Sequence, residues 1–210
     1  FYKKKKEKLP TGTCLILITP DSERTMCTFL GTAGKINEND IDLKIINKSK
    51  MIFLEGYLWD KGEPQKAFEK AIGGESKVAM SLSDKFCVDR HKTHFFELVK
   101  NKLDITFANE EEILSLINAN NFQEVISFAK EIKKILIITR GEKGAVSINN
   151  DTVTEVGIKK NLNVVDLTGA GDLFASGYLH GYLNGFSEEE CLNKGTEMSS
   201  KVIQQIGARL

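Results

Sequence analysis

Short apolar runs alternate with longer amphipathic stretches along most of the chain. The runs that predict strands are Thr13–Thr19, Arg24–Leu30, Met51–Glu55, Val78–Leu82, Ile105–Ala108, Ile135–Thr139, Ala145–Ile148 and Asn163–Val165. The stretches with apolar residues at helical spacing are Pro64–Ile72, His91–Lys100, Glu110–Asn118, Phe122–Ile132, Leu173–Leu183 and Glu188–Gln204. Such an alternation of strands and helices predicts an α/β fold.

Several of the strand-like runs are apolar at successive positions, as in Ile135-Leu136-Ile137-Ile138. A strand with this pattern is covered on both faces, as in a parallel sheet between two helix layers. We therefore expect a doubly wound, mostly parallel sheet.

The first two strands differ, because they flank the turn-forming cluster Pro20-Asp21-Ser22-Glu23. Two short strands joined in this way predict an antiparallel hairpin. Such a hairpin is either a sheet edge or a flap over a site, and the pattern does not separate the two.

The hydrophobic content and the net charge of the chain exclude some classes of function. The 210 residues are 41% hydrophobic, which is enough for one well-buried core. Lys and Arg total 29, as do Asp and Glu, so the chain has no general attraction to nucleic acid or to an acidic membrane. The basic run Lys3–Lys6 is local and is interpreted as a solvated segment.

The four cysteines are scattered without a CxxC pair, so neither a disulfide framework nor a zinc site is expected. This favours a reducing cytoplasm.

No apolar stretch approaches the roughly 18 residues that a membrane span needs. Because the chain starts at Phe1 within a strand-like pattern, we expect that an N-terminal piece precedes it.

The most informative stretch runs from Asn163 to Phe174. A β-branched run leads into Gly169-Ala170-Gly171, and a helical pattern follows at once. Ligands bind at such strand-to-helix turns in open α/β sheets, and free amides at a helix start attract anions. The three small residues can therefore hold the charge of a transferring phosphoryl group.

Asp172 follows that turn directly. A carboxylate beside a phosphate site can accept a proton from an attacking hydroxyl, although Asp172 could equally be a helix cap. A dinucleotide fingerprint would need glycine where Phe174 stands, and the chain contains no Walker A string.

The string Asp166-Leu167-Thr168-Gly169-Ala170-Gly171-Asp172 resembles the second signature of the ribokinase family, also called the PfkB carbohydrate kinases. Leu167 stands where that signature usually has Thr. Further resemblances, in the family's order, are Asn109–Glu112 to its NxxE motif, Thr139–Gly144 to its TxGxxG nucleotide loop and Cys191–Ala208 to the stretch beside the adenine.

The resemblance implies a role for each matched residue. It implies Asp172 as general base; Gly169, Ala170 and Gly171 as the anion hole; Asn109 and Glu112 around Mg²⁺ through water; Thr139, Gly141, Gly144 and Thr168 beside the nucleotide; Asn193 and Gly207 on the adenine side; and Asp166 with Thr168 and the loop at Gly207 at a monovalent-cation site, often K⁺. From the residues alone, Asn109 and Glu112 would rather be a helix cap, and the two roles are compatible.

The family fold implies a lid or junction segment at 1–34 and a ribokinase-like core with the ATP site at 35–210. The expected reaction is ATP-dependent phosphorylation of a hydroxymethyl group. Adenosine is the favoured acceptor, and ribose, fructose or a related sugar is the alternative. A non-catalytic nucleotide-binding protein is the alternative from another class. A homodimer through the lid is left open.

Overall fold

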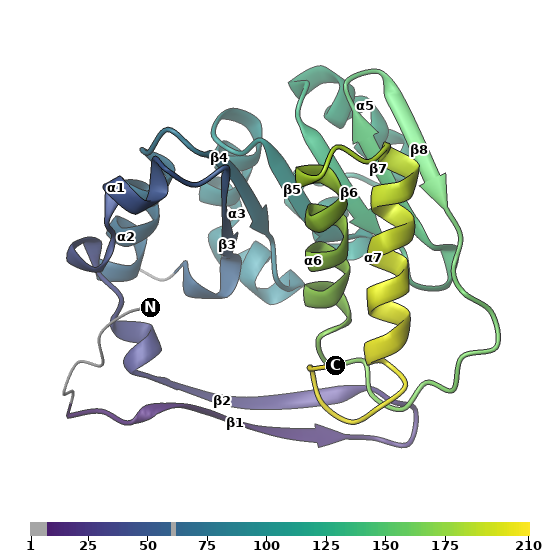
Figure 1. Cartoon of the computed structure of the whole chain (residues 1–210), viewed down its shortest axis with the longest axis horizontal. Coiled ribbons are helices and arrows are strands. Elements are labelled where there is room, and N and C mark those ends of the chain that lie inside the picture. The colour runs from purple at the N-terminus through teal and green to yellow at the C-terminus, as the bar shows by residue number, and fades with distance from the viewer. Residues whose placement is uncertain (1–7, 60–61) are drawn as a thin grey trace.

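The computed structural model describes residues 8–59 and 62–210, and Figure 1 shows its elements. The basic run Lys3–Lys6, for which we expected a solvated segment, lies outside the described residues. No helix in the described ranges is long and apolar enough to cross a membrane.

A six-stranded sheet forms the centre of the molecule, with strands in the order β3-β4-β5-β6-β7-β8. These strands are β3 (Met51–Glu55), β4 (Lys77–Ser81), β5 (Ile105–Asn109), β6 (Ile135–Thr139), β7 (Ala145–Asn149) and β8 (Thr152–Val156). The first four are parallel, and β7 and β8 continue the sheet antiparallel. The prediction of a mostly parallel sheet is confirmed.

Helices cover both faces of this sheet. They are α1 (Leu43–Ile46), α2 (Glu63–Ile72), α3 (Lys85–Asn101), α4 (Glu110–Ile117), α5 (Phe122–Ile132), α6 (Ala170–Leu183) and α7 (Glu188–Val202). Four 3₁₀ turns lie between elements: Thr32–Lys35, Glu38–Asp40, Gly56–Leu58 and Gly141–Lys143. Helices α6 and α7 lie side by side in front of the sheet in Figure 1.

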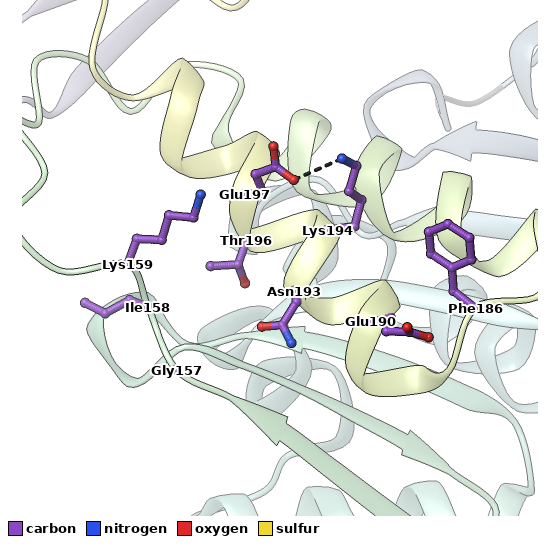
Figure 2. A pocket seen from close by; sticks show the side chains of 9 residues that line it. All are labelled: Gly157, Ile158, Lys159, Phe186, Glu190, Asn193, Lys194, Thr196 and Glu197. Atoms are coloured by element: carbon purple, nitrogen blue, oxygen red, sulfur yellow. Dashed lines mark hydrogen bonds and ion pairs between the residues drawn. The ribbon is translucent and has the colours of Figure 1, made fainter.

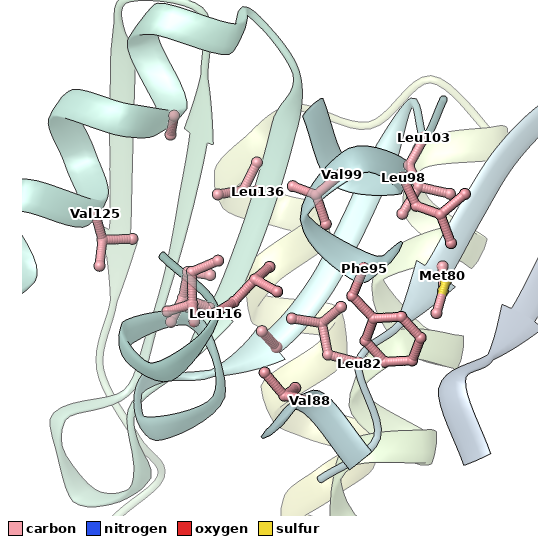
Figure 3. Packing of buried hydrophobic residues seen from close by; sticks show 14 of the residues in the cluster. Met80, Leu82, Val88, Phe95, Leu98, Val99, Leu103, Leu116, Val125 and Leu136 are labelled. Carbon is pink, nitrogen blue, oxygen red and sulfur yellow. The ribbon is translucent and has the colours of Figure 1, made fainter. Parts of the chain in front are cut away.

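Successive residues of one strand pack into different layers, which is why the strands are continuously apolar. Met80 of β4 belongs to the cluster that includes Phe95 of α3 (Figure 3). Its neighbour Ala79 belongs instead to the cluster that includes Tyr178 of α6. All four side chains are fully buried. The sheet therefore separates two hydrophobic layers.

Helices α6 and α7 approach each other at two glycines. A Cβ atom on Gly177 would lie 2.6 Å from the carbonyl oxygen of Lys194, and one on Gly195 would lie 2.9 Å from that of Phe174. The close contact fixes α7 against α6, and both helices carry candidate site residues.

Strands β1 (Thr11–Ile18) and β2 (Arg24–Gly31) form a separate antiparallel hairpin. It lies along the end of the molecule at which α6 begins and α7 ends (Figure 1). At its tip the hydroxyl of Ser22 donates to the carbonyl of Val164, 3.1 Å away. The hairpin is thus a flap across that end and is not an edge of the main sheet.

Several elements differ from the sequence-based expectation. Asn163–Val165 is not a strand, because the amide of Val165 donates to the carbonyl of Ile203 in an irregular segment. The polar run Thr152–Val156 was not predicted, yet it pairs with β7 after a turn in which Asn150 has φ 53°. Helix α3 begins at Lys85, well before His91, because the carboxylate of Asp84 caps it at the amide of Cys87.

We predict that Gly177→Ala lowers the free energy of unfolding by about 2 kcal/mol, because its methyl group would press on the backbone of α7. Gly157→Ala is the control, since a Cβ atom at that residue would have nothing within 4 Å. Urea denaturation of both variants checks this. Equal stability of the two variants would contradict the close helix contact.

Candidate active site

The glycine turn before α6 is built as a tight approach to the C-terminal loop. Gly169 has φ 79°, and a Cβ atom there would lie 2.7 Å from that of Ala208. Such a conformation and such closeness require glycine. Helix α6 then starts at Ala170, with no side-chain hydrogen bond at its N-cap.

Asp172 lies in the first turn of α6 with its side chain exposed. Because Gly169 is the N-cap, Asp172 does not serve as the cap that the sequence left as an alternative. Its carboxylate accepts no hydrogen bond from any residue in the described part of the chain, so it is available to a ligand.

The backbone amides at this turn are partly free. The amide of Ala170 donates to the carbonyl of Leu167 at 3.2 Å, so it is already engaged. Within the described ranges, the amides of Gly169 and Gly171 have no backbone acceptor. A Cβ atom on Gly171 would have nothing within 4 Å, so space is open beside it. Two of the three residues expected to hold an anion thus present free donors.

Asp166 ties this turn to the C-terminal loop. Its Oδ1 accepts from the amide of Thr168 at 2.8 Å, and its Oδ2 accepts from the amide of Gly207 at 2.9 Å. The side chain is 1% exposed. Burial alone would raise the pKa of Asp166, but the donors of Thr168 and Gly207 outweigh it and hold the pKa below its usual value.

The hydroxyl of Thr168 is buried beside Asp166 and has no hydrogen-bond partner among the described residues. An orphaned oxygen next to an ionised carboxylate suits a cation that takes oxygen ligands. These two residues therefore fit the monovalent cation that the sequence suggests.

Asn109 and Glu112 form a reciprocal cap at the start of α4. The amide of Asn109 donates to Glu112 Oε2 at 2.9 Å, its Nδ2 donates to Oε1 at 2.7 Å, and Glu112 N donates to Asn109 Oδ1 at 2.8 Å. Glu112 is buried, and burial raises its pKa to about 7 although the hydrogen bond from Asn109 lowers it. Because both carboxylate oxygens already accept hydrogen bonds, the pair fits Mg²⁺ held through water.

The turn after β6 lies directly beside this pair, since Asn109 of β5 is the register partner of Thr139 of β6. Gly141 has φ 55° and Gly144 has φ 90°. A Cβ atom on Gly144 would lie 2.0 Å from the carbonyl oxygen of Val156. Only glycine fits there, because the turn packs directly against the backbone at the end of β8.

A cavity of about 400 Å³ lies between α7 and the segment after β8 (Figure 2). It is lined by Gly157, Ile158, Lys159, Phe186, Glu190, Asn193, Lys194, Thr196 and Glu197. Lys194 and Glu197 form an ion pair at 2.9 Å within this lining. Of the two residues expected on the adenine side, Asn193 lines the cavity, whereas Gly207 lies at the Asp166 carboxylate.

Glu55, which the sequence did not single out, interacts with the charge of Asp172. It ends β3, and its Oε2 accepts from the hydroxyl of Ser83 at 3.3 Å. Burial raises its pKa to about 7, and the charge of Asp172 contributes to the rise. The signal that could have revealed it is a carboxylate at the end of a parallel strand, where ligands bind.

The comparisons with known proteins agree with this geometry. The sequence model of the pfkB family carbohydrate kinases matches residues 1–210. Among solved structures, a probable sugar kinase from Rhizobium etli CFN 42 is 38% identical with a TM-score of 0.93, over 98% of this chain and 64% of that one. The adenosine kinase from Sinorhizobium meliloti is 37% identical with a TM-score of 0.91, over 96% of this chain and 63% of that one.

A curated relative, an adenosine kinase from Dictyostelium discoideum, is 28% identical over 95% of this chain and 64% of its own length. The chain therefore spans slightly less than two thirds of the length of this relative.

We predict that the free energy of unfolding falls between pH 4.5 and about pH 7 partly through Glu55. A carboxyl with a raised pKa binds more protons when folded, so the stability that it contributes at low pH is lost as pH rises from about 4.5 to about 7. Glu55→Gln should reduce that loss by an amount on the order of 1 kcal/mol. Urea denaturation across this pH range measures it, and an unchanged pH dependence would contradict the raised pKa.

Proposed function

We propose, because the chain belongs to the pfkB family of carbohydrate kinases, that the protein transfers the γ-phosphoryl group of ATP to a hydroxymethyl group of a nucleoside or sugar. The observation that carries this proposal is the start of α6. There, free amides at Gly169 and Gly171 lie beside an exposed, unengaged carboxylate at Asp172.

Asp172 is the general base in this proposal. The acceptor hydroxyl gives its proton to the Asp172 carboxylate as its oxygen bonds to the γ-phosphorus, and the bond from phosphorus to ADP breaks. The amides of Gly169 and Gly171 stabilise the charge on the transferring group, with the dipole of α6 behind them. In the observed geometry Ala170 would contribute only through its small size.

Each remaining predicted residue has a place in the same proposal. Asn109 and Glu112 would hold the waters of Mg²⁺, which supplies charge neutralisation at the phosphates when bound. Asp166 and Thr168 would hold K⁺ below the glycine turn. Thr139, Gly141 and Gly144 would border the triphosphate and ribose, and Gly207 would act through Asp166.

The cavity at Asn193 would receive the adenine of ATP. Support comes from its volume of about 400 Å³ and from the amide of Asn193 in its lining. A cavity of that size suits a small-molecule group, and a side-chain amide can both donate to and accept from a purine edge.

Adenosine is the favoured acceptor, since two of the relatives described above are named adenosine kinases. The alternative is a sugar such as ribose or fructose, which the sugar kinase from Rhizobium etli supports. An apolar slot for a base would distinguish a nucleoside site from a sugar site.

The segment 1–34, to which the hairpin of β1 and β2 belongs, is proposed as the lid or its junction, and the segment 35–210 as the core. The exposed Leu15, Leu17, Met26 and Phe29 of β1 and β2 support a homodimer through this lid. The four cysteines are free, which supports a cytoplasmic location.

The acceptor is tested by ADP release from the complete natural protein with Mg-ATP, K⁺ and a panel of adenosine, other nucleosides, ribose and fructose. We predict turnover that depends on one acceptor, with adenosine the most active. A protein that binds ATP but releases no ADP with any acceptor would favour the non-catalytic nucleotide-binding alternative.

We predict that Asp172→Asn lowers kcat by about 10³-fold while ATP affinity changes little, because the amide keeps the shape but cannot accept the proton. Asp151→Asn is the matched control, since Asp151 is an exposed acid in the turn between β7 and β8. A kcat close to that of the natural protein in Asp172→Asn would exclude Asp172 as the base.

A further inference from the structure

Arg140 makes a set of contacts that its place in the nucleotide turn does not require. Its Nε donates to Glu110 Oε2 at 3.1 Å, and its terminal NH2 donates to Oε1 at 3.2 Å. Its guanidinium carbon also lies 3.8 Å from the centre of the Phe122 ring. A fork to both carboxylate oxygens, together with stacking on a ring, holds the guanidinium in one orientation.

These contacts join three chain segments that end or begin at the same edge of the sheet. Arg140 directly follows β6, Glu110 is the first residue of α4, and Phe122 is the first residue of α5. The register partners Asn109 and Thr139 precede Glu110 and Arg140, so the pair extends the strand pairing past the ends of β5 and β6.

The ion pair of Arg140 and Glu110 is largely shielded from solvent, whereas the second cation beside Glu110 is exposed. The side chains of Arg140 and Glu110 are 16% and 23% exposed, whereas Lys143, whose Nζ lies 3.4 Å from the same carboxylate, is 67% exposed. The hydrogen bonds from Arg140 are the largest cause that lowers the pKa of Glu110. Exposed ion pairs contribute little, so Arg140 is the partner that matters.

We propose that Arg140 is a positioning residue that locks the nucleotide turn Thr139–Gly144 to the Asn109–Glu112 cap, so that the phosphates of the nucleotide and the divalent cation bind as one unit. This inference rests on the proposed kinase function and adds a device that couples its two binding elements. The phosphates would border the turn, and the cation's waters would border the cap. A rigid link between the two keeps both sets of ligands at a fixed separation.

A lysine could not replace Arg140 in this role. An ammonium group keeps the positive charge, but it cannot make the two parallel hydrogen bonds to Glu110 or stack as a plane on Phe122. Arg140→Lys therefore removes the orientation of the link while retaining its charge.

The test measures nucleotide affinity with and without Mg²⁺ in the complete natural protein and in three variants. In the natural protein we expect Mg²⁺ to strengthen ATP binding. In Arg140→Lys we expect that strengthening to fall about tenfold, with KM for Mg-ATP raised about tenfold and kcat within about threefold. Glu110→Gln should behave in the same way. Lys66→Gln, which breaks an exposed ion pair with Glu63 in α2, is the control and should leave all three values unchanged.

The double variant Arg140→Lys with Glu110→Gln should be no worse than either single variant, since the two residues act as one link. The inference is overturned if Arg140→Lys keeps the full effect of Mg²⁺ on ATP binding. It is also overturned if kcat and the melting temperature fall together while that effect is unchanged, because Arg140 would then only stabilise the fold. Failure of the proposed function is distinguishable, since the natural protein itself would then lack turnover.

Discussion

The parallel pairing of β3, β4, β5 and β6 is the constraint on which the rest of the structure depends. Parallel strands bring their carboxyl ends to one edge, so Glu55 of β3, Asn109 of β5 and Thr139 of β6 all lie at the same side of the sheet. Both faces of these strands are covered by helices, which fixes the edge on a rigid base. That edge therefore brings together the carboxylate of Glu55, the side-chain amide of Asn109 and the glycine turn after β6.

The second constraint is the buried carboxylate of Asp166. By accepting from the amides of Thr168 and Gly207, it holds the glycine turn and the C-terminal loop together. That loop in turn contacts Gly169, where no side chain would fit. Asp166 therefore fixes the orientation of the free amides at the start of α6, although it forms no part of that anion site itself.

Much of this arrangement could be predicted from the sequence, because it depends on local patterns. Continuous apolar runs such as Ile135–Thr139 indicate buried parallel strands, and Gly169-Ala170-Gly171-Asp172 indicates a turn at a helix start. Asn163–Val165 misled the prediction, since its valines favour a strand while its backbone pairs with Ile203 of the C-terminal loop.

The features that the sequence did not reveal depend on contacts between distant segments. Glu55 comes under the influence of Asp172 because β3 ends at the same side of the sheet, where burial and, to a smaller extent, the charge of Asp172 raise the pKa of Glu55. Gly207 was expected both on the adenine side and near Asp166, and it lies at Asp166 because the C-terminal loop folds back on the glycine turn. The link between Arg140 and Glu110 likewise follows from strand register.

In the proposed mechanism, one site at the start of α6 moves the phosphoryl group directly from ATP to the acceptor, with Asp172 as base and no phosphorylated protein between them. The stereochemical course at phosphorus tests this most directly, with ATP made chiral at the γ-phosphorus by isotopes and sulfur, and the acceptor that supports turnover. A single in-line transfer predicts inversion of configuration. Retention would require a second transfer through the protein and would contradict the account.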